Sequence, residues 1–174
     1  MANVVWVSIA GPDRPGLVAE VAGRLFDLGA NLGDTTFAVL GEGCEFTSLV
    51  ELPASVSAVE LKAELKTLAA LKGAKLEVEP FALGAVHGPM GRVTHRIRIS
   101  GGDRPGITAR LAEVFADFGA NIVRLNSERV PGTGGARYDM IFAVAIPPGR
   151  ASACLATVAN TAGTMDLRCV WEEA

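Results

Sequence analysis

A stretch of six residues, GPDRPG from Gly11 to Gly16, has a second copy ninety positions later, GGDRPG from Gly101 to Gly106. Each copy follows a short apolar run and begins a run with apolar residues at helical spacing. That run ends on Gly-Ala-Asn, at 29–31 and again at 119–121. Between positions 11 and 31 the two copies share eleven of twenty-one residues. Because unrelated segments rarely agree so well, we predict that the chain uses one supersecondary unit twice.

The repeat predicts two small domains rather than one large domain. The chain has 174 residues and a mass of 18.1 kDa, which leaves about 85 residues for each copy. We assign residues 1–83 to the first domain, 84–91 to a linker and 92–174 to the second domain. The linker assignment depends on three glycines and one proline between Gly84 and Gly91, where no apolar periodicity occurs.

Each copy has the predicted order β-α-β-β-α-β. Strands are assigned where apolar residues alternate, and helices where they recur every three or four residues. The first copy has predicted strands at 3–10, 31–40, 44–52 and 75–81, a helix over 16–28, and a helix with the stripe Leu61, Leu65, Leu68 and Leu71 that Gly73 stops. The second copy has predicted strands at 92–100, 121–130, 138–146 and 166–171, a helix through Ile107, Leu111, Phe115 and Phe118, a glycine-rich hairpin loop at 131–135, and a helix over 151–162 that Gly163 ends.

Capping and breaking residues predict where these elements begin and end. The prolines and glycines of GPDRPG are expected to end the first strand. Pro15 suits a first helical turn, and Asp13 is expected to accept hydrogen bonds from the free N–H groups there. Gly29 is expected to end the helix, and Ser57 with Glu60 predicts a capping box at the next one.

The element order predicts an α+β fold made of two ferredoxin-like sandwiches. Each would have a four-stranded antiparallel sheet with both helices on one face. The other face of each sheet would be open, with Trp6 on it in the first domain and Arg96 and Arg98 in the second.

Composition limits the classes of function. The formal net charge is −3 and the pI is near 5.4, which gives no attraction to a phosphate backbone, so we expect no direct nucleic-acid binding. We expect no transmembrane helix, no signal peptide and no membrane partner, and therefore a cytoplasmic protein. Three widely spaced cysteines, Cys44, Cys154 and Cys169, do not fit a disulfide framework or zinc spacing, so we interpret each as an apolar filler.

The paired motifs carry a family resemblance. A β-α-β-β-α-β unit with Asp-Arg-Pro-Gly after its first strand and Gly-Ala-Asn-(Leu/Ile) entering its second resembles the ACT domain, a small regulatory module that binds amino acids. Two copies that fill nearly the whole chain are similar to the family of the glycine cleavage system transcriptional repressor. The resemblance implies a non-catalytic regulatory protein with no cofactor and no metal.

Both halves of the motif suit a free amino acid. A helix start offers unpaired N–H groups and a positive dipole end to a carboxylate. An Asp carboxylate can hold the ammonium group, and an Asn side chain both donates and accepts hydrogen bonds. The structural alternative is that each motif is only a turn or a helix cap. The candidate ligand-binding residues are Asp13, Arg14, Gly16, Leu17 and Asn31 in the first copy and Asp103, Arg104, Gly106, Ile107 and Asn121 in the second.

Helix length constrains how these residues combine. About thirteen residues at 1.5 Å each separate Asp13 from Asn31 by about 20 Å, too far for one amino acid to touch both. We therefore expect Asp13 to face Asn121, and Asp103 to face Asn31, across a pseudo-two-fold axis. This pairing predicts two quasi-equivalent sites, per chain if the copies pair with each other or per dimer if they pair between chains.

Some residues depart from the family or offer weaker signals. Some amino-acid-binding ACT domains have a hydrogen-bonding side chain where this chain has Gly11 and Gly101, and many have Asn in place of Asp13 and Asp103. His87 and His95 lack catalytic or metal-binding neighbours, and His95 is expected to face the helices. A basic face is also possible, formed by Arg92, Arg96, Arg98, Arg124 and Arg129.

We therefore expect a sensor that binds a small amino acid, with glycine and serine favoured, and that controls a transcription activator or an enzyme through protein contact. We also expect a homodimer. The alternative is a ligand-independent assembly module. An enzyme is not expected, because no nucleophile–base pair or carboxylate pair is visible.

Overall fold

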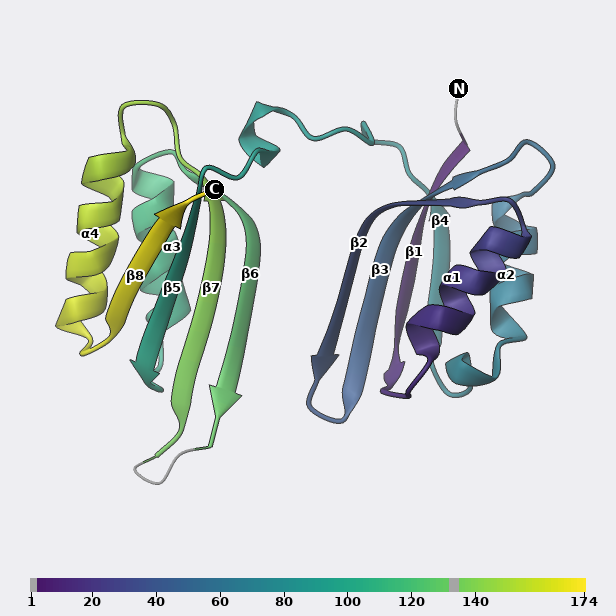
Figure 1. Ribbon diagram of the computed structural model, residues 1–174, viewed down its shortest axis with the longest axis horizontal. Coiled ribbons are helices and arrows are strands. Elements are labelled where there is room, and N and C mark those ends of the chain that lie inside the picture. Colours follow the sequence, from purple (N-terminus) through teal and green to yellow (C-terminus); the bar gives the residue numbers. More distant parts are fainter. Residues whose placement is uncertain (1–2, 132–134) are drawn as a thin grey trace. The chain divides into compact units, whose positions relative to one another are not determined.

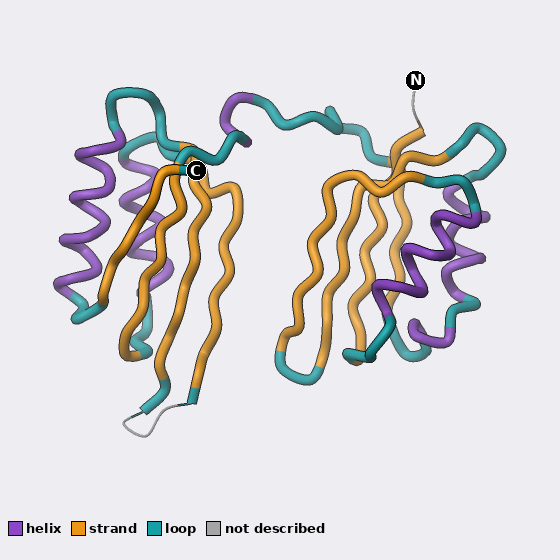
Figure 2. The backbone as a smooth tube through the Cα atoms, viewed as in Figure 1, coloured by secondary structure: helices purple, strands orange, loops and turns teal. Residues whose placement is uncertain are grey.

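The computed structural model describes residues 3–131 and 135–174, and the predicted hairpin tip at 132–134 lies outside them. The chain divides into two compact units between Ala85 and Val86. Each unit is a four-stranded antiparallel sheet with two helices on one face, as Figures 1 and 2 show, and the predicted α+β fold is confirmed. Among the described residues, no helix is long and apolar enough to cross a membrane.

The first unit follows the predicted order. Its elements are β1 (Asn3–Pro12), α1 (Leu17–Asp27), β2 (Asn31–Leu40), β3 (Gly43–Leu52), α2 (Ala58–Lys66), a short 3-10 helix η1 (Ala69–Leu71) and β4 (Lys75–Pro80). The strands lie in the order β2-β3-β1-β4, so β2 and β4 form the edges. Val5, Val7 and Ile9 of β1 face the helices and are fully buried, because alternate residues of a strand point to opposite faces.

The second unit repeats this plan. Its elements are η2 (Pro89–Gly91), β5 (His95–Gly102), α3 (Ile107–Asp117), β6 (Asn121–Val130), β7 (Arg137–Ala145), α4 (Ala151–Thr164) and β8 (Arg168–Glu173). The strand order is β6-β7-β5-β8. Its core includes Phe115 and Phe142, whose ring centroids are 5.3 Å apart. Each unit therefore has a hydrophobic core of its own.

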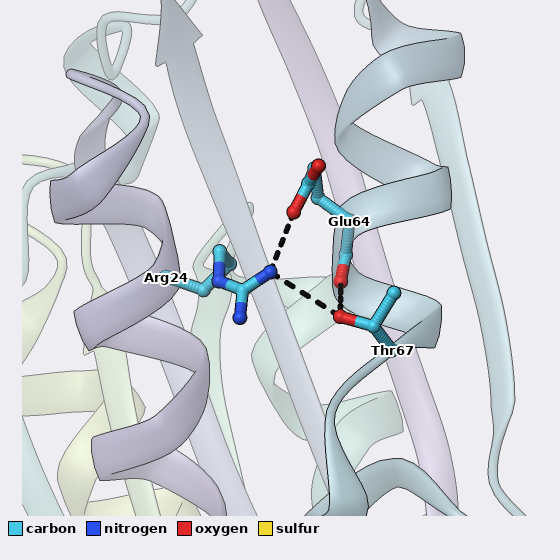
Figure 3. Close-up of polar contacts among 3 residues, drawn as sticks. All are labelled: Arg24, Glu64 and Thr67. Atoms are coloured by element: carbon cyan, nitrogen blue, oxygen red, sulfur yellow. Dashed lines mark hydrogen bonds and ion pairs between the residues drawn. The ribbon is translucent and has the colours of Figure 1, made fainter.

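Two helices of the first unit are joined by polar contacts. Arg24 of α1 donates to the Glu64 carboxylate and to the Thr67 hydroxyl at the end of α2 (Figure 3). The Thr67 hydroxyl also donates to the Glu64 carbonyl at 2.7 Å, and the capping box of Ser57 and Glu60 at the other end of α2 is confirmed.

Several predicted boundaries were wrong for identifiable reasons. The first strand does not stop before GPDRPG, because Gly11 and Pro12 still pair in register with Cys44 and Gly43. The second helix ends at Lys66 rather than at Gly73, since Leu68 has an extended backbone with ψ 130° and η1 follows it.

The last helix shows a similar difference. α4 runs through Gly163 to Thr164. The residue that terminates α4 is therefore not Gly163 but Asp166, which has the left-handed φ of 55°. The Leu167 N–H then donates to the Ala162 carbonyl. The last strand consequently begins at Arg168, not at Asp166, because a left-handed residue cannot continue a strand ladder.

Candidate functional site

The motif loop joins β1 to α1 through a left-handed glycine. Gly16 is the N-cap of α1 with φ 88°, and Gly106 is the N-cap of α3 with φ 86°. No side chain caps either helix, so the prediction that Asp13 caps α1 was wrong. The physical reason is the sharp left-handed turn, which only glycine adopts at little cost and which itself directs the chain into the helix. The first N–H groups of the helix have no side-chain acceptor at the N-cap.

The arginine of the motif ties the loop to its own unit. The Arg14 guanidinium donates to two backbone carbonyls at η1, Ala69 at 3.0 Å and Lys72 at 2.8 Å. Arg104 instead donates to the Asp166 carboxylate at 2.9 Å. Both arginines therefore brace the segment that precedes the last strand of the unit, and their proposed contact with a ligand stays a prediction.

Gly11 and Gly101 allow a close approach of two backbone segments. A Cβ atom at Gly11 would lie 2.6 Å from the Cβ of Ala74, and one at Gly101 would lie 2.6 Å from a methyl carbon of Leu167. Real Cβ atoms do not approach other carbons so closely. At Gly11 the nearest atoms are the Cβ and Cα of Ala74, which cannot turn away, so a side chain does not fit there in the observed packing. At Gly101 the nearest atom is the end of the Leu167 side chain, so a side chain there requires Leu167 to change its rotamer.

A groove of about 590 Å³ begins at the motif loop of the first unit. Residues 13–16 form its polar end, and α1 and the edge strand β2 form its apolar walls. Val18, Phe37 and Val39 line it while remaining 40%, 41% and 53% exposed. The Leu17 side chain is only 1% exposed, and the Ile107 side chain 2%, so both pack in the cores. Leu17 also lines the groove, and a ligand contact of either residue stays a prediction.

The second unit has different residues at the matching positions. In the first unit, Phe37 and Val39 of β2 pair with Phe46 and Cys44. On β6 of the second unit, the places of Phe37 and Val39 are taken by Ser127 and Arg129. Arg129 Nε lies 2.9 Å from the Asp103 carboxylate. Arg129 therefore lies on the helix side and neutralises Asp103, so the prediction that it belongs to a basic face with Arg96 and Arg98 was wrong.

Asp13 has a different electrostatic setting from Asp103. Among the described residues, no ion pair of the Asp13 carboxylate is found.

Burial, and secondarily the nearby Asp13 charge, raise the pKa of the Cys44 thiol. Burial also raises the thiol pKa of Cys154 and Cys169. Since the reactive form of cysteine is the thiolate, these thiols are not activated nucleophiles.

The Gly-Ala-Asn segments close the helices as expected. Gly29 and Gly119 have φ 69° and 66°, and each following alanine N–H donates back into the last helical turn. Asn31 and Asn121 then open β2 and β6. The eleven residues of α1 span about 16 Å, so Asp13 and Asn31 do lie at opposite ends of one helix.

Asn121 is also held by the segment predicted as a featureless linker. Its side-chain amide donates to the Met90 carbonyl of η2 at 2.8 Å. Such a bond leaves the Asn121 side-chain oxygen and the second N–H of its amide available to another group. His95 is buried on the helix side, as expected, and its Nδ1 lies 2.9 Å from the Thr94 hydroxyl.

The structure thus gathers Asp13 and Gly16 at one groove, and places Asn31 away from it. The apolar walls at Val18, Phe37 and Val39 were missed by the sequence reasoning. A signal was available, because alternate apolar residues on one face of a strand indicate packing. The sequence does not show that β2 is an edge strand with half-exposed residues, because this depends on the order of the strands in the sheet.

Comparison with known proteins agrees with this fold. The sequence matches the ACT domain family over residues 3–79 and again over residues 95–153. It is 29% identical to the glycine cleavage system transcriptional repressor of Escherichia coli K12 over 128 residues, which is 72% of this chain and 64% of that protein. The match thus spans less than two thirds of the relative's length. A UPF0237 protein of Streptococcus mutans is 27% identical over 77 residues, 44% of this chain and 88% of its own.

Two solved structures resemble the whole chain. A protein from Galdieria sulphuraria has a TM-score of 0.77 at 25% identity and covers 100% of this chain and 99% of its own. The structure of a candidate glycine cleavage system transcriptional repressor has a TM-score of 0.64 at 13% identity, with coverage of 100% and 98%. At that identity the second likeness shows the fold alone.

Proposed function

Because this chain is built from two ACT domains and belongs to that family, we propose that it is a non-catalytic regulatory protein that binds a small amino acid and controls a protein partner. The family and the repressor relative support a regulatory, amino-acid-sensing role. Glycine and serine are the first ligands to test, since the relative is named for the glycine cleavage system.

The observation that carries the proposal is the polar end of the groove in the first unit. There the Asp13 carboxylate lies in the same loop as the start of α1, whose N-cap Gly16 leaves the first helical N–H groups without a side-chain acceptor. The helix start suits an α-carboxylate, and Asp13 suits an α-ammonium group. An amino acid carries both charges a few ångströms apart, so one ligand can use both features.

We propose that a second ACT unit completes each site with its Gly-Ala-Asn segment, because Asn31 lies a helix length away from Asp13. The ligand then acts by stabilising one association of ACT units over another, which is a population shift. The partner surface that this exposes is read by a transcription regulator or an enzyme in the cytoplasm. The acidic pI favours contact with protein over contact with nucleic acid.

A ligand panel tests the proposal. The full chain is mixed with each of the twenty amino acids at millimolar concentration, and its thermal midpoint is measured. A ligand at one hundred times its Kd stabilises the folded state by about 2.7 kcal/mol, which is easily detected. The expected result is a higher thermal midpoint with one or a few small amino acids, and no such rise in Asp13→Ala.

Asp27→Ala is the matched control, because Asp27 is an exposed carboxylate at the far end of the same helix. Asp27→Ala should show the same ligand-induced rise in thermal midpoint as the wild type. A thermal midpoint that no amino acid changes would contradict the sensor proposal.

A ligand-independent assembly module is the second candidate. It is favoured by the second unit, where Arg129 neutralises Asp103 and the Met90 carbonyl already accepts one N–H of the Asn121 amide. Under this alternative the association of chains is the same with and without any amino acid. Sedimentation of the chain in both conditions separates the two candidates.

A further inference from the structure

The open faces of the two sheets differ in charge. Residues on these faces are identified by register, since directly paired residues of antiparallel strands point to the same side. In the first unit the face holds four glutamates and one lysine: Glu45, Glu51, Glu77, Glu79 and Lys75. In the second unit it holds five arginines and three acidic residues: Arg96, Arg98, Arg124, Arg137, Arg168, Glu128, Asp139 and Glu172. The first face is therefore acidic and the second is weakly basic.

The shapes of the two faces also differ. Trp6 stands in the middle of the first face, paired with Leu49 and Glu79, and is 48% exposed. The second face has a hollow of about 460 Å³ whose lining includes Arg96, Arg98, Ile141 and Val170. Ile141 and Val170 are 45% and 43% exposed and flank Arg98 on the neighbouring strands. Glu172 also lines the hollow beside Arg96, and Arg98 forms an ion pair with Asp139 at 3.5 Å. A large aromatic side chain therefore faces solvent on one unit, and a cavity suited to one faces solvent on the other.

We infer that the open face of the first unit of one copy docks on the open face of the second unit of another copy, with Trp6 in the hollow between Arg96 and Arg98. An indole ring packs well against apolar side chains such as Ile141 and Val170 and attracts guanidinium groups over its face. Glu51 and Glu79, which flank Trp6 on the acidic face, meet the arginines around the hollow. Aromatic anchors in desolvated pockets are typical of strong interfaces, and complementary charge fixes their orientation.

A two-fold dimer would form this contact twice. In each unit six residue pairs join a central strand to an edge strand, β1 to β4 and β5 to β8. Four strands about 4.8 Å apart and about 20 Å long present a face of about 400 Å². One pair of faces covers about 800 Å² counted on both sides, and two pairs cover about 1,600 Å². That is the area of a standard stable interface.

Charge reversal in the full chain tests the inference. Arg96→Glu with Arg98→Glu makes both faces acidic, and Glu51→Arg with Glu79→Arg makes both basic. Sedimentation equilibrium at low ionic strength should show a wild-type dimer, and a dimer Kd raised at least tenfold in each double variant. An equimolar mixture of the two variants should form a heterodimer, because each contact then pairs one acidic with one basic face. Trp6→Ala should also weaken the dimer at least tenfold.

The control is Arg110→Glu with Arg150→Glu, which changes the charge by the same amount at exposed positions on the helix side, in α3 and at the N-cap of α4. It should dimerise like the wild type, and circular dichroism should show all variants folded. A wild-type chain that stays monomeric at about 100 μM overturns the inference, and leaves an acidic partner of another kind as the occupant of the basic face. Double variants that dimerise like the wild type, or fail to restore each other, also overturn it.

Discussion

Arg14 offers a test of whether the motif loop is braced by its own unit before any ligand arrives. Its guanidinium donates to two carbonyls, those of Ala69 and Lys72. Arg14→Met keeps the apolar stem and removes both bonds. Hydrogen bonds to a charged group contribute about 1.5–3 kcal/mol each. These lie at the surface, so we reduce them to about 0.5–1 kcal/mol each. We expect a loss of about 1–2 kcal/mol in the unfolding free energy of the first unit.

Arg104→Met is the internal comparison, because it changes the same residue of the same motif. Arg104 makes one exposed ion pair with Asp166, whose side chain is 79% exposed. Such pairs contribute about 0.2–1 kcal/mol. Arg104→Met should therefore cost less than Arg14→Met, although the two loops share the sequence Asp-Arg-Pro-Gly.

The assay is urea unfolding of the full chain without amino acid, together with hydrogen exchange of the amides around η1. The N–H groups of Leu71, Lys72 and Ala74 make turn hydrogen bonds in this segment and should exchange faster in Arg14→Met. For a unit of this size the loss corresponds to about 4–16 °C in the thermal midpoint. If Arg14→Met is as stable as the wild type without ligand, or if Arg104→Met loses more, the bracing argument is wrong.

Three further outcomes are expected. Gly11→Ala should destabilise the chain by about 1–3 kcal/mol in urea unfolding, because the added methyl overlaps the Cβ and Cα of Ala74. Gly101→Ala should cost less, because the overlapping Leu167 methyl can rotate away, and Gly84→Ala, in open space, should not destabilise the chain. Hydrogen bonds from the Ser57 backbone, and then from its side chain, lower the pKa of Glu60. The stabilisation from these bonds is therefore present above the unfolded pKa of glutamate and is lost as pH falls through the lower folded pKa. The difference in unfolding free energy between wild type and Ser57→Ala should consequently narrow on acidification, and a difference independent of pH would contradict this. Cys44 and Cys154 should resist alkylation by iodoacetamide in the native chain at pH 7–8 and react fully in urea, as mass spectrometry can show, because burial raises the pKa of both thiols.

Much of the fold followed from local patterns. Alternating residues such as Val5, Val7 and Ile9 predicted β1 and its buried face, and the capping box of Ser57 and Glu60 predicted the start of α2. These features depend on neighbours a few residues apart, so they can be read from the chain. The family resemblance and the predicted ferredoxin-like architecture are confirmed for the same reason, since the motif halves recur in register.

The candidate site could be predicted only in part. The motif correctly identified a strand-to-helix turn, but the predicted role of Asp13 as a cap was wrong, and the left-handed N-cap at Gly16 was not predicted. Arg14 reaches carbonyls 55 and 58 residues away, and Arg104, with the same neighbours in sequence, reaches a carboxylate instead. No local sequence pattern distinguishes these partners, because each arginine bonds to a segment that is distant in sequence and that only the folded unit brings next to the loop.

The duplicated sequence by itself determined two copies of one fold, and it marked the Asp-Arg-Pro-Gly and Gly-Ala-Asn turns in each. Tertiary structure decided how far the copies differ. The edge position of β2 leaves an apolar groove beside Asp13, whereas Arg129 at the same place on β6 neutralises Asp103. Cross-strand register likewise collects acidic residues around Trp6 on one sheet and arginines around a hollow on the other. The physical reason is that a turn depends on residues next to one another, while a groove, an ion pair or a charged face depends on which distant strands lie side by side.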